Sequence, residues 1–252
     1  EDLKSPVCLV TGGSSGIGLA TAKLFFREGY RIAICGRNRQ RLQAAVDQIV
    51  GDRTDNRRRV YSVVADLADV NAAKGLAEQV VEHFGRIDVL VNNAARDDRH
   101  GWEDVTSDYF DERVATNLKH FFFAIQAVAP KMIETALGGS IINLGSNSWW
   151  EAGGGMPVYT TSKAAVHGLT RGMARDLGPH KIRVNTVVPG WIMTERQKEL
   201  WATPEKLEAH RQRQCLPDLI DPVYVARMIL FLASDDSAMC TAGNFMVEAG
   251  SI

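Results

Sequence analysis

Short apolar runs alternate with longer segments of helical periodicity along most of this chain. Runs typical of strands buried on both faces occupy residues 7–10, 31–35, 60–65, 89–92, 140–144, 183–187 and 245–247. Helical periodicity occupies residues 17–28, 38–50, 69–84, 108–135 and 160–177, and further helices begin near Thr203 and Asp221. Because helices of this length connect parallel strands by right-handed crossovers, the pattern predicts an α/β, doubly wound Rossmann-type fold with a seven-stranded parallel sheet and helices on both faces.

The chain length supports one large domain. Its 252 residues are 45% hydrophobic, which is enough for a single core. No repeat, low-complexity segment or linker divides the sequence. We therefore expect a single domain over residues 1–252, with a less regular insert at about 191–219.

Charge and hydropathy exclude several classes of partner. The formal net charge is −1, so there is no electrostatic case for binding nucleic acid or an anionic membrane. No apolar run reaches the roughly 18 residues of a membrane helix, and residues 1–6 lack the apolar core of a signal peptide. These features predict a soluble, cytoplasmic protein.

A glycine-rich segment directly follows the first apolar run. Gly12, Gly16 and Gly18 have the spacing GxxxGxG. Such glycines permit a tight turn and a close approach of backbone to phosphate, and the helix that follows directs its free N–H groups at the anion. After a buried strand and before a helix, this pattern predicts a nucleotide-phosphate site, with a plain turn as the alternative.

The end of the second apolar run bears on which dinucleotide is bound. Enzymes that prefer NAD usually place an acid there for the ribose 2′-hydroxyl, but this chain has Gly36 followed by Arg37. A guanidinium can bind a 2′-phosphate, so NADP is favoured and NAD stays possible, unless Arg37 is only a loop charge. Asp66, after the third run, could accept a hydrogen bond from the adenine amino group or simply begin the next helix.

The chain resembles the short-chain dehydrogenase/reductase family over essentially its full length. The matching pieces are TGGSSGIG at 11–18, Asp66, NNAA at 92–95, Asn117, GSIINLGS at 139–146, YTTSK at 159–163 and VNTVVPG at 184–190. The chain departs from the family at Ala95, where glycine is usual, and at Gly145, where serine is common. The resemblance implies one dinucleotide-binding and catalytic domain that transfers a hydride between a nicotinamide cofactor and an alcohol or carbonyl substrate.

The resemblance also implies four catalytic residues. Tyr159 would be the general acid/base, but a phenol with a pKa near 10 is a poor base at pH 7. Lys163 lies one helical turn on, on the same helix face, and its ammonium, together with the charge of oxidised nicotinamide, would favour the phenolate. Ser146 would hydrogen-bond the reacting oxygen, and Asn117 would hold a water that joins Lys163 to solvent. A tyrosine four residues before a lysine is, alone, an ordinary helix face.

The same resemblance implies the residues that contact the cofactor. They are Gly12, Ser14, Ser15, Gly16, Ile17, Gly18, Arg37, Asp66, Leu67, Asn93, Ala94, Tyr159, Lys163, Pro189, Gly190, Ile192 and Thr194. No metal site is expected, because the six histidines show no ligand spacing with acids or thiols. Serine hydrolysis is not expected either, since Ser146 lies in no G-x-S-x-G elbow.

Three segments bear on the substrate: residues 96–100, 147–150 and 191–219. They combine flat aromatic side chains with many hydrogen-bonding groups, which suits a polyhydroxylated ring. They are also similar to bacterial sugar (aldose) 1-dehydrogenases of the galactose and xylose type, which implies oxidation of an anomeric C1 hydroxyl to a lactone. Candidate substrate contacts, each of which could instead be loop packing, are Ser146, Asn147, Trp149, Tyr159, Trp191, Arg196 and Gln197.

Two other functions stay open. A carbonyl reductase of the 3-oxoacyl type would need a basic docking patch, but Arg96 and Arg99 are interspersed with Asp97 and Asp98. A catalytically silent nucleotide sensor or scaffold would tolerate damage to the catalytic residues, which are intact. The family resemblance further implies a homotetramer, with the helices near 108–135 and 160–177 paired across one two-fold axis and the last strand and helix across another.

Overall fold

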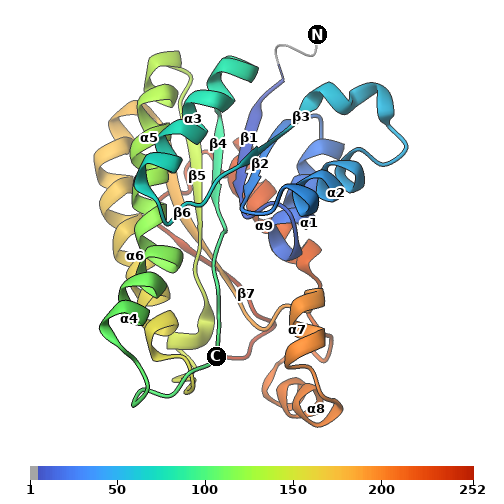
Figure 1. The fold of residues 1–252 in the computed structure, drawn as a ribbon, viewed down its shortest axis with the longest axis vertical. Coiled ribbons are helices and arrows are strands. Elements are labelled where there is room, and N and C mark those ends of the chain that lie inside the picture. The colour runs from blue at the N-terminus through green and yellow to red at the C-terminus, as the bar shows by residue number, and fades with distance from the viewer. Residues whose placement is uncertain (1–4) are drawn as a thin grey trace.

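Seven parallel strands form one sheet in the order β3-β2-β1-β4-β5-β6-β7 in the computed structural model, which describes residues 5–252 (Figure 1). The strands are β1 (Val7–Thr11), β2 (Arg31–Gly36), β3 (Val60–Val64), β4 (Val89–Asn92), β5 (Gly139–Leu144), β6 (Ile182–Pro189) and β7 (Asn244–Val247). The predicted fold class is confirmed. Most of the N-terminal segment searched for a signal peptide lies outside the described residues.

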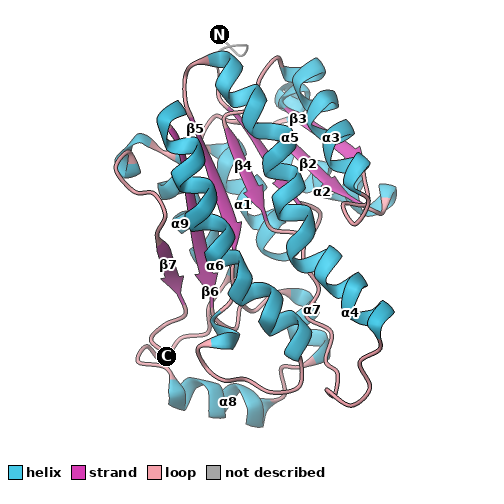
Figure 2. Ribbon diagram, turned by 90° about the vertical axis from the view of Figure 1, so that its left-hand side faces the viewer, coloured by secondary structure: helices cyan, strands magenta, loops and turns pink. Residues whose placement is uncertain are grey.

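Helices cover both faces of the sheet (Figures 1 and 2). The helices are α1 (Gly16–Arg27), α2 (Arg39–Val50), α3 (Val70–Phe84), α4 (Ser107–Val114), α5 (His120–Thr135), α6 (Pro157–Leu177), α7 (Glu195–Leu200), α8 (Pro204–Arg213) and α9 (Pro222–Ala233). Helices α1, α2 and α9 pack on one face, and α3, α5 and α6 pack on the other. Within residues 5–252, no helix combines the length and the apolar character needed to cross a membrane.

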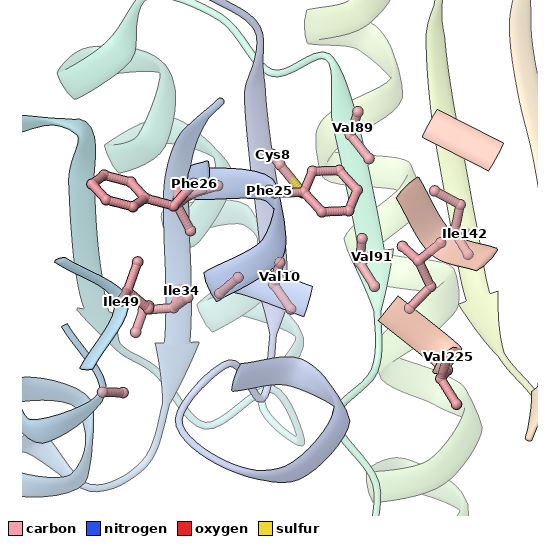
Figure 3. Packing of buried hydrophobic residues seen from close by; sticks show 14 of the residues in the cluster. Cys8, Val10, Phe25, Phe26, Ile34, Ile49, Val89, Val91, Ile142 and Val225 are labelled. Atoms are coloured by element: carbon pink, nitrogen blue, oxygen red, sulfur yellow. The ribbon is translucent and has the colours of Figure 1, made fainter. Parts of the chain in front are cut away.

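Alternation of side chains along the strands explains why both faces are apolar. In β1, Cys8 and Val10 enter the cluster beneath α1 and α9, whereas Val7 and Leu9 enter the cluster beneath α3 and α5. Figure 3 shows the first cluster, in which Phe25 lies against the sheet. Because all seven strands are parallel, their carboxyl ends meet at one edge of the sheet, where a doubly wound sheet binds its ligand.

One segment differs from the sequence expectation. The helix expected over residues 108–135 is interrupted by a π-helical turn, Ala115–Lys119, between α4 and α5.

The charged segment before β3 is a 3₁₀ helix, Thr54–Arg59. Arg59 is buried because its guanidinium donates to the carbonyl oxygens of Phe26 and Tyr30, at 3.1 and 2.8 Å.

The insert at 191–219 forms α7 and α8, which lie beyond the carboxyl ends of the strands (Figure 2). The Thr203 hydroxyl accepts a hydrogen bond from the Lys206 amide at 3.3 Å and so caps α8. Pro204 follows at the first helical position, where its missing N–H costs nothing. The predicted capped helix is therefore present, and the insert covers the edge of the sheet where a ligand would bind.

Candidate active site

A cleft runs along the carboxyl ends of the strands in two connected parts of about 680 and 700 Å³. The parts share Ile17, Asn93, Ala95 and Thr194. The first part is also lined by the predicted cofactor residues Gly12, Ser14, Ser15, Arg37, Asp66, Leu67 and Ala94. The second part is lined by the predicted residues Ser146, Asn147, Tyr159, Lys163, Pro189, Gly190, Trp191, Ile192 and Gln197.

The glycine loop leaves no room for side chains. Gly12 has a φ of +65°, and a Cβ there would lie 2.9 Å from the Ala94 Cα. A Cβ on Gly18 would lie 2.4 Å from the Gly12 carbonyl oxygen. Gly16 and Gly18 do not line the cleft themselves. Gly18 lets α1 pack closely beneath the loop, whereas Gly16 has a φ of +52°, and a Cβ there would lie 3.1 Å from Thr194 Cγ2. Ser15 is the N-cap of α1 and makes no side-chain cap bond within residues 5–252, so the first turn keeps donors for an anion.

Two arginines stand at the outer end of the first part. Arg37 Nη1 lies 4.0 Å from Asp66 Oδ2, and both side chains are 57% exposed, so this ion pair is weak. Arg41, in the first turn of α2, lines the same part of the cleft. It was not among the predicted cofactor residues.

Helix α6 brings the predicted catalytic pair to the second part. Lys163 is 1% exposed, and its Nζ donates to the Leu144 carbonyl oxygen at 2.7 Å. This amine also lies 4.9 Å from the ring centroid of Phe121 and 5.8 Å from that of Tyr159. Ser146, which follows β5, hydrogen-bonds the Tyr159 hydroxyl. The serine, the phenol and the amine therefore meet at one point of the cleft wall.

Asn117 lies in the π-helical turn between α4 and α5. Its Oδ1 accepts a hydrogen bond from the Arg96 amide at 2.8 Å. Its Nδ2 is buried and has no acceptor within residues 5–252. A buried donor without a partner is costly, and a bound water would satisfy it. π-Helical turns are frequent at functional sites, and this one sets Asn117 beside the loop that follows β4.

Burial shifts the two catalytic groups in opposite directions. Burial raises the pKa of Tyr159 above its ordinary value and the Asp97 carboxylate raises it further, against the hydrogen bond from Ser146 and the charge of Arg99. Burial lowers the pKa of Lys163 to about 7, and Asp97 opposes that shift. The protein alone therefore favours a neutral phenol. A further positive charge in the cleft is needed for the phenolate, as the sequence argument assumed.

A polar network joins α7 to the loop after β4. Trp191 Nε1 donates to Gln197 Oε1 at 2.8 Å, and Gln197 Nε2 donates to Asp97 Oδ2 at 2.6 Å. Arg196 Nη2 donates to Asp98 Oδ1 at 2.8 Å and lines the first part of the cleft, not the second. Trp191 and Gln197 thus lie where a substrate would bind, and Arg196 lies where the cofactor would bind.

The structure does not bring Trp149 into the cleft, contrary to the sequence expectation. Its ring stacks on Trp150 at 3.8 Å, and its Nε1 donates to His167 Nε2 at 3.2 Å. The side chain is therefore used to pack against α6. Asn147 does line the cleft, where its Nδ2 donates to Glu151 Oε1 at 2.7 Å.

Several residues that line the second part were not named individually from the sequence, although all but Glu151 lie in the segments 96–100 and 191–219 that bear on the substrate. They are Asp97, Arg99, Glu151, Trp201, Lys206, His210 and Arg213. Three of them, on α8, are spaced as one helical face, a signal that was visible in the sequence. Glu151 could not have been found in this way because its position depends on Asn147 and on Ser251, 100 residues away.

Comparisons with known proteins agree with this geometry. A family model described as enoyl-(acyl carrier protein) reductase matches residues 12–251. A "probable galactose dehydrogenase" of Rhizobium meliloti is 41% identical over 99% of this chain and 96% of its own. A D-xylose 1-dehydrogenase of Caulobacter vibrioides is 41% identical over 98% of this chain and 96% of its own. A variant of actinorhodin polyketide ketoreductase, solved with NADPH, is 29% identical with a TM-score of 0.89 over 99% of this chain and 98% of its own.

The lowered pKa of Lys163 predicts a pH-dependent stability. The pKa of the lysine is near 10.4 in the unfolded chain, whereas it is about 7 in the folded protein. Between these values the unfolded chain binds more protons, so the free energy of unfolding should rise with pH. Relative to Lys163→Met, the wild type should gain up to about 1.4 kcal/mol per pH unit from about pH 7 to pH 9, measured by urea unfolding.

The exposed Lys74 on α3 provides the matched control. The difference between the wild type and Lys74→Met should not change over the same pH range. A flat difference between the wild type and Lys163→Met would show that the buried amine keeps an ordinary pKa.

Proposed function

The chain belongs to the short-chain dehydrogenase/reductase family, and we propose that it is an NAD(P)-dependent aldose 1-dehydrogenase that oxidises the anomeric C1 hydroxyl of a sugar to a lactone. The observation that carries this proposal is the meeting of Ser146, Tyr159 and Lys163 in a cleft continuous with the glycine loop. The polar and aromatic lining of the second part, together with the 41% identity to sugar dehydrogenases, supports an aldose as the substrate.

The catalytic residues divide the proton chemistry among them. When bound, NAD(P)⁺ accepts the hydride released as the C1–H bond breaks, and the sugar becomes a lactone. The Tyr159 oxygen takes the proton of the C1 hydroxyl, and the Ser146 hydroxyl holds that same oxygen by a hydrogen bond. Lys163, fixed on the Leu144 carbonyl, supplies positive charge beside the phenolate and keeps N–H donors for the cofactor ribose. Asn117 holds a water that passes the proton onward.

The first part of the cleft fits a dinucleotide. The glycine loop and the first turn of α1 suit the pyrophosphate, since a Cβ at Gly12 would fill the space beside Ala94. Asp66 and Leu67 would flank the adenine, and Thr194 would lie near the nicotinamide end. Gly36, Arg37 and Arg41 surround the place of the ribose 2′ group and include no acid, which favours NADP over NAD.

A homotetramer would cover the apolar side chains that remain exposed on two helices. Phe122 on α5 and Phe231 on α9 are both exposed in the single chain. We propose that α4, α5 and α6 pair across one two-fold axis, and that α9 and β7 pair across another.

A substrate panel tests the proposed activity. The purified chain should reduce NADP with at least one of galactose, xylose, glucose and rhamnose, and should give the lactone as the product. Aliphatic alcohols should not be oxidised, and β-keto esters should not be reduced with NADPH. If none of these aldoses supports reduction of either cofactor, the proposed function is wrong; efficient reduction of β-keto esters would point instead to a carbonyl reductase.

Replacing the proposed base should separate catalysis from binding. Tyr159→Phe removes the group that accepts the proton but keeps the ring, so turnover should fall by about 10²- to 10⁴-fold. The dissociation constant of the cofactor, measured by calorimetry, should stay within a few fold of the wild type. Turnover near the wild-type rate would contradict the role given to Tyr159.

Arg37 should control the choice of cofactor. One lost charge-assisted contact to a 2′-phosphate is worth about 1.5–3 kcal/mol, so Arg37→Ala should raise KM for NADP by about 10- to 150-fold. KM for NAD should change little, because NAD has no phosphate there. Arg39→Ala is the matched control, since Arg39 lies two residues after Arg37, at the start of α2, and does not line the cleft. An unchanged ratio of the two KM values in Arg37→Ala would mean that this arginine does not read the phosphate.

A further inference from the structure

One face of α8 presents positively charged side chains to the second part of the cleft. Lys206, Ala209, His210 and Arg213 line it, at the i, i+3, i+4 and i+7 spacing of a single helix face. The acidic residues of the helix lie elsewhere: Glu205 and Glu208 do not line the cleft, and Glu208 pairs with Arg211 at 3.7 Å. The acidic side chains of α8 therefore lie away from the cleft, and the face that lines the cleft is basic.

Arg99, from the loop after β4, adds a third positive charge to the same part of the cleft. Its guanidinium carbon lies 5.5 Å from the ring centroid of Trp201, and Lys206 Nζ lies 5.9 Å from the same centroid. Arg99 also acts on Tyr159, whose pKa it lowers against the larger effect of burial. Two positive charges therefore share one indole, and one of them is electrostatically linked to the reacting phenol.

These positive charges are not paired with carboxylates in the part of the chain that the structure describes. Within residues 5–252, Arg99, Lys206 and Arg213 form no ion pair within 4 Å. The two carboxylates in this part of the cleft are already engaged. Asp97 accepts from Gln197 at 2.6 Å and lies 3.7 Å from Arg196, and Glu151 accepts from Asn147 and Ser251 at 2.7 and 2.9 Å.

His210 marks the same wall as a binding surface. It is only 3% exposed, its ring meets Trp191 edge-on at 5.2 Å, and it makes no hydrogen bond within residues 5–252. His210, Arg213 and Glu151 all line the second part of the cleft. Burial lowers the pKa of His210, Arg213 lowers it further, and Glu151 opposes them. A buried imidazole without a partner is costly and is suited to bind a hydroxyl group.

We propose that the aldose oxidised by this enzyme carries an anionic group, a carboxylate or a phosphate, at the end remote from C1, and that Arg99, Lys206 and Arg213 bind it. His210 and Glu151 would bind the hydroxyls between that group and the anomeric carbon. The inference rests on the proposed function and narrows its substrate to sugar acids or sugar phosphates. The reaction is unchanged: C1 loses a hydride to NAD(P)⁺ and the C1 hydroxyl loses a proton, so the anionic sugar leaves as its lactone.

The test compares sugars that differ only in the group at C6, which is neutral in some and anionic in others. For both the galactose and the glucose series, kcat/KM is measured with the neutral aldose, the uronate, the uronate methyl ester and the 6-phosphate. The uronate or the 6-phosphate should exceed both neutral members of its series by about tenfold or more. Whichever anionic member is preferred identifies the group. The preference should shrink as salt rises from about 0.05 to 0.5 M, because the charges are partly exposed.

Matched variants locate the effect on α8. The double variant Lys206→Gln/Arg213→Gln should lower the ratio of anionic to neutral kcat/KM by about tenfold. Arg211→Gln, on the outward face of the same helix and paired with Glu208, should leave that ratio unchanged. Equal or better kinetics with the neutral aldoses would overturn the inference while leaving aldose oxidation intact. If no member of either series is oxidised, the inference fails, and the proposed function fails with it when xylose and rhamnose are not oxidised either.

Discussion

The hydrogen bond from Lys163 to the Leu144 carbonyl is the constraint on which the site depends. At 2.7 Å it joins α6 to the end of β5 and fixes a buried amine at the wall of the cleft. An ammonium buried with few acceptors is costly, so the pKa of Lys163 falls to about 7. The same burial raises the pKa of Tyr159. Without a further positive charge, the fold therefore holds this pair near its neutral forms.

The burial of Tyr159 and Lys163 makes the charge of the neighbouring Asp97 important. Its carboxylate raises the pKa of Tyr159 and of Lys163, so an unbalanced Asp97 would oppose the phenolate while it favoured the ammonium. Gln197 and Arg196, both on α7, hold this carboxylate. Helix α7, which covers the cleft, thus also holds the Asp97 carboxylate that acts on Tyr159 and Lys163. The position of α7 and the ease of ionising Tyr159 are consequently coupled.

The parts of the site that depend on local sequence could be predicted, and the parts that depend on distant contacts could not. The glycine loop and the Tyr159–Lys163 spacing follow from a single turn and a single helix, and both lie where expected. The place of Trp149 outside the cleft could not be predicted, because its ring packs on a neighbouring indole and on His167 of α6. Asn117 was expected in a regular helix, yet it lies in a π-helical turn that no propensity rule specifies.

The basic face of α8 shows why specificity is the least predictable property of such a chain. The catalytic residues are held by the strands and by buried hydrogen bonds. Helix α8 instead lies between its cap, Thr203, and the segment at Cys215, whose amide donates to the Ala249 carbonyl oxygen at 2.9 Å. Those two attachments bear on which face of α8 meets the cleft, because its own sequence is polar. Since the Lys206 and Arg213 side chains on that face are exposed, their charge can change at little cost to the fold. The catalytic residues held by the sheet can therefore stay unchanged while substitutions in the insert at 191–219 change the substrate.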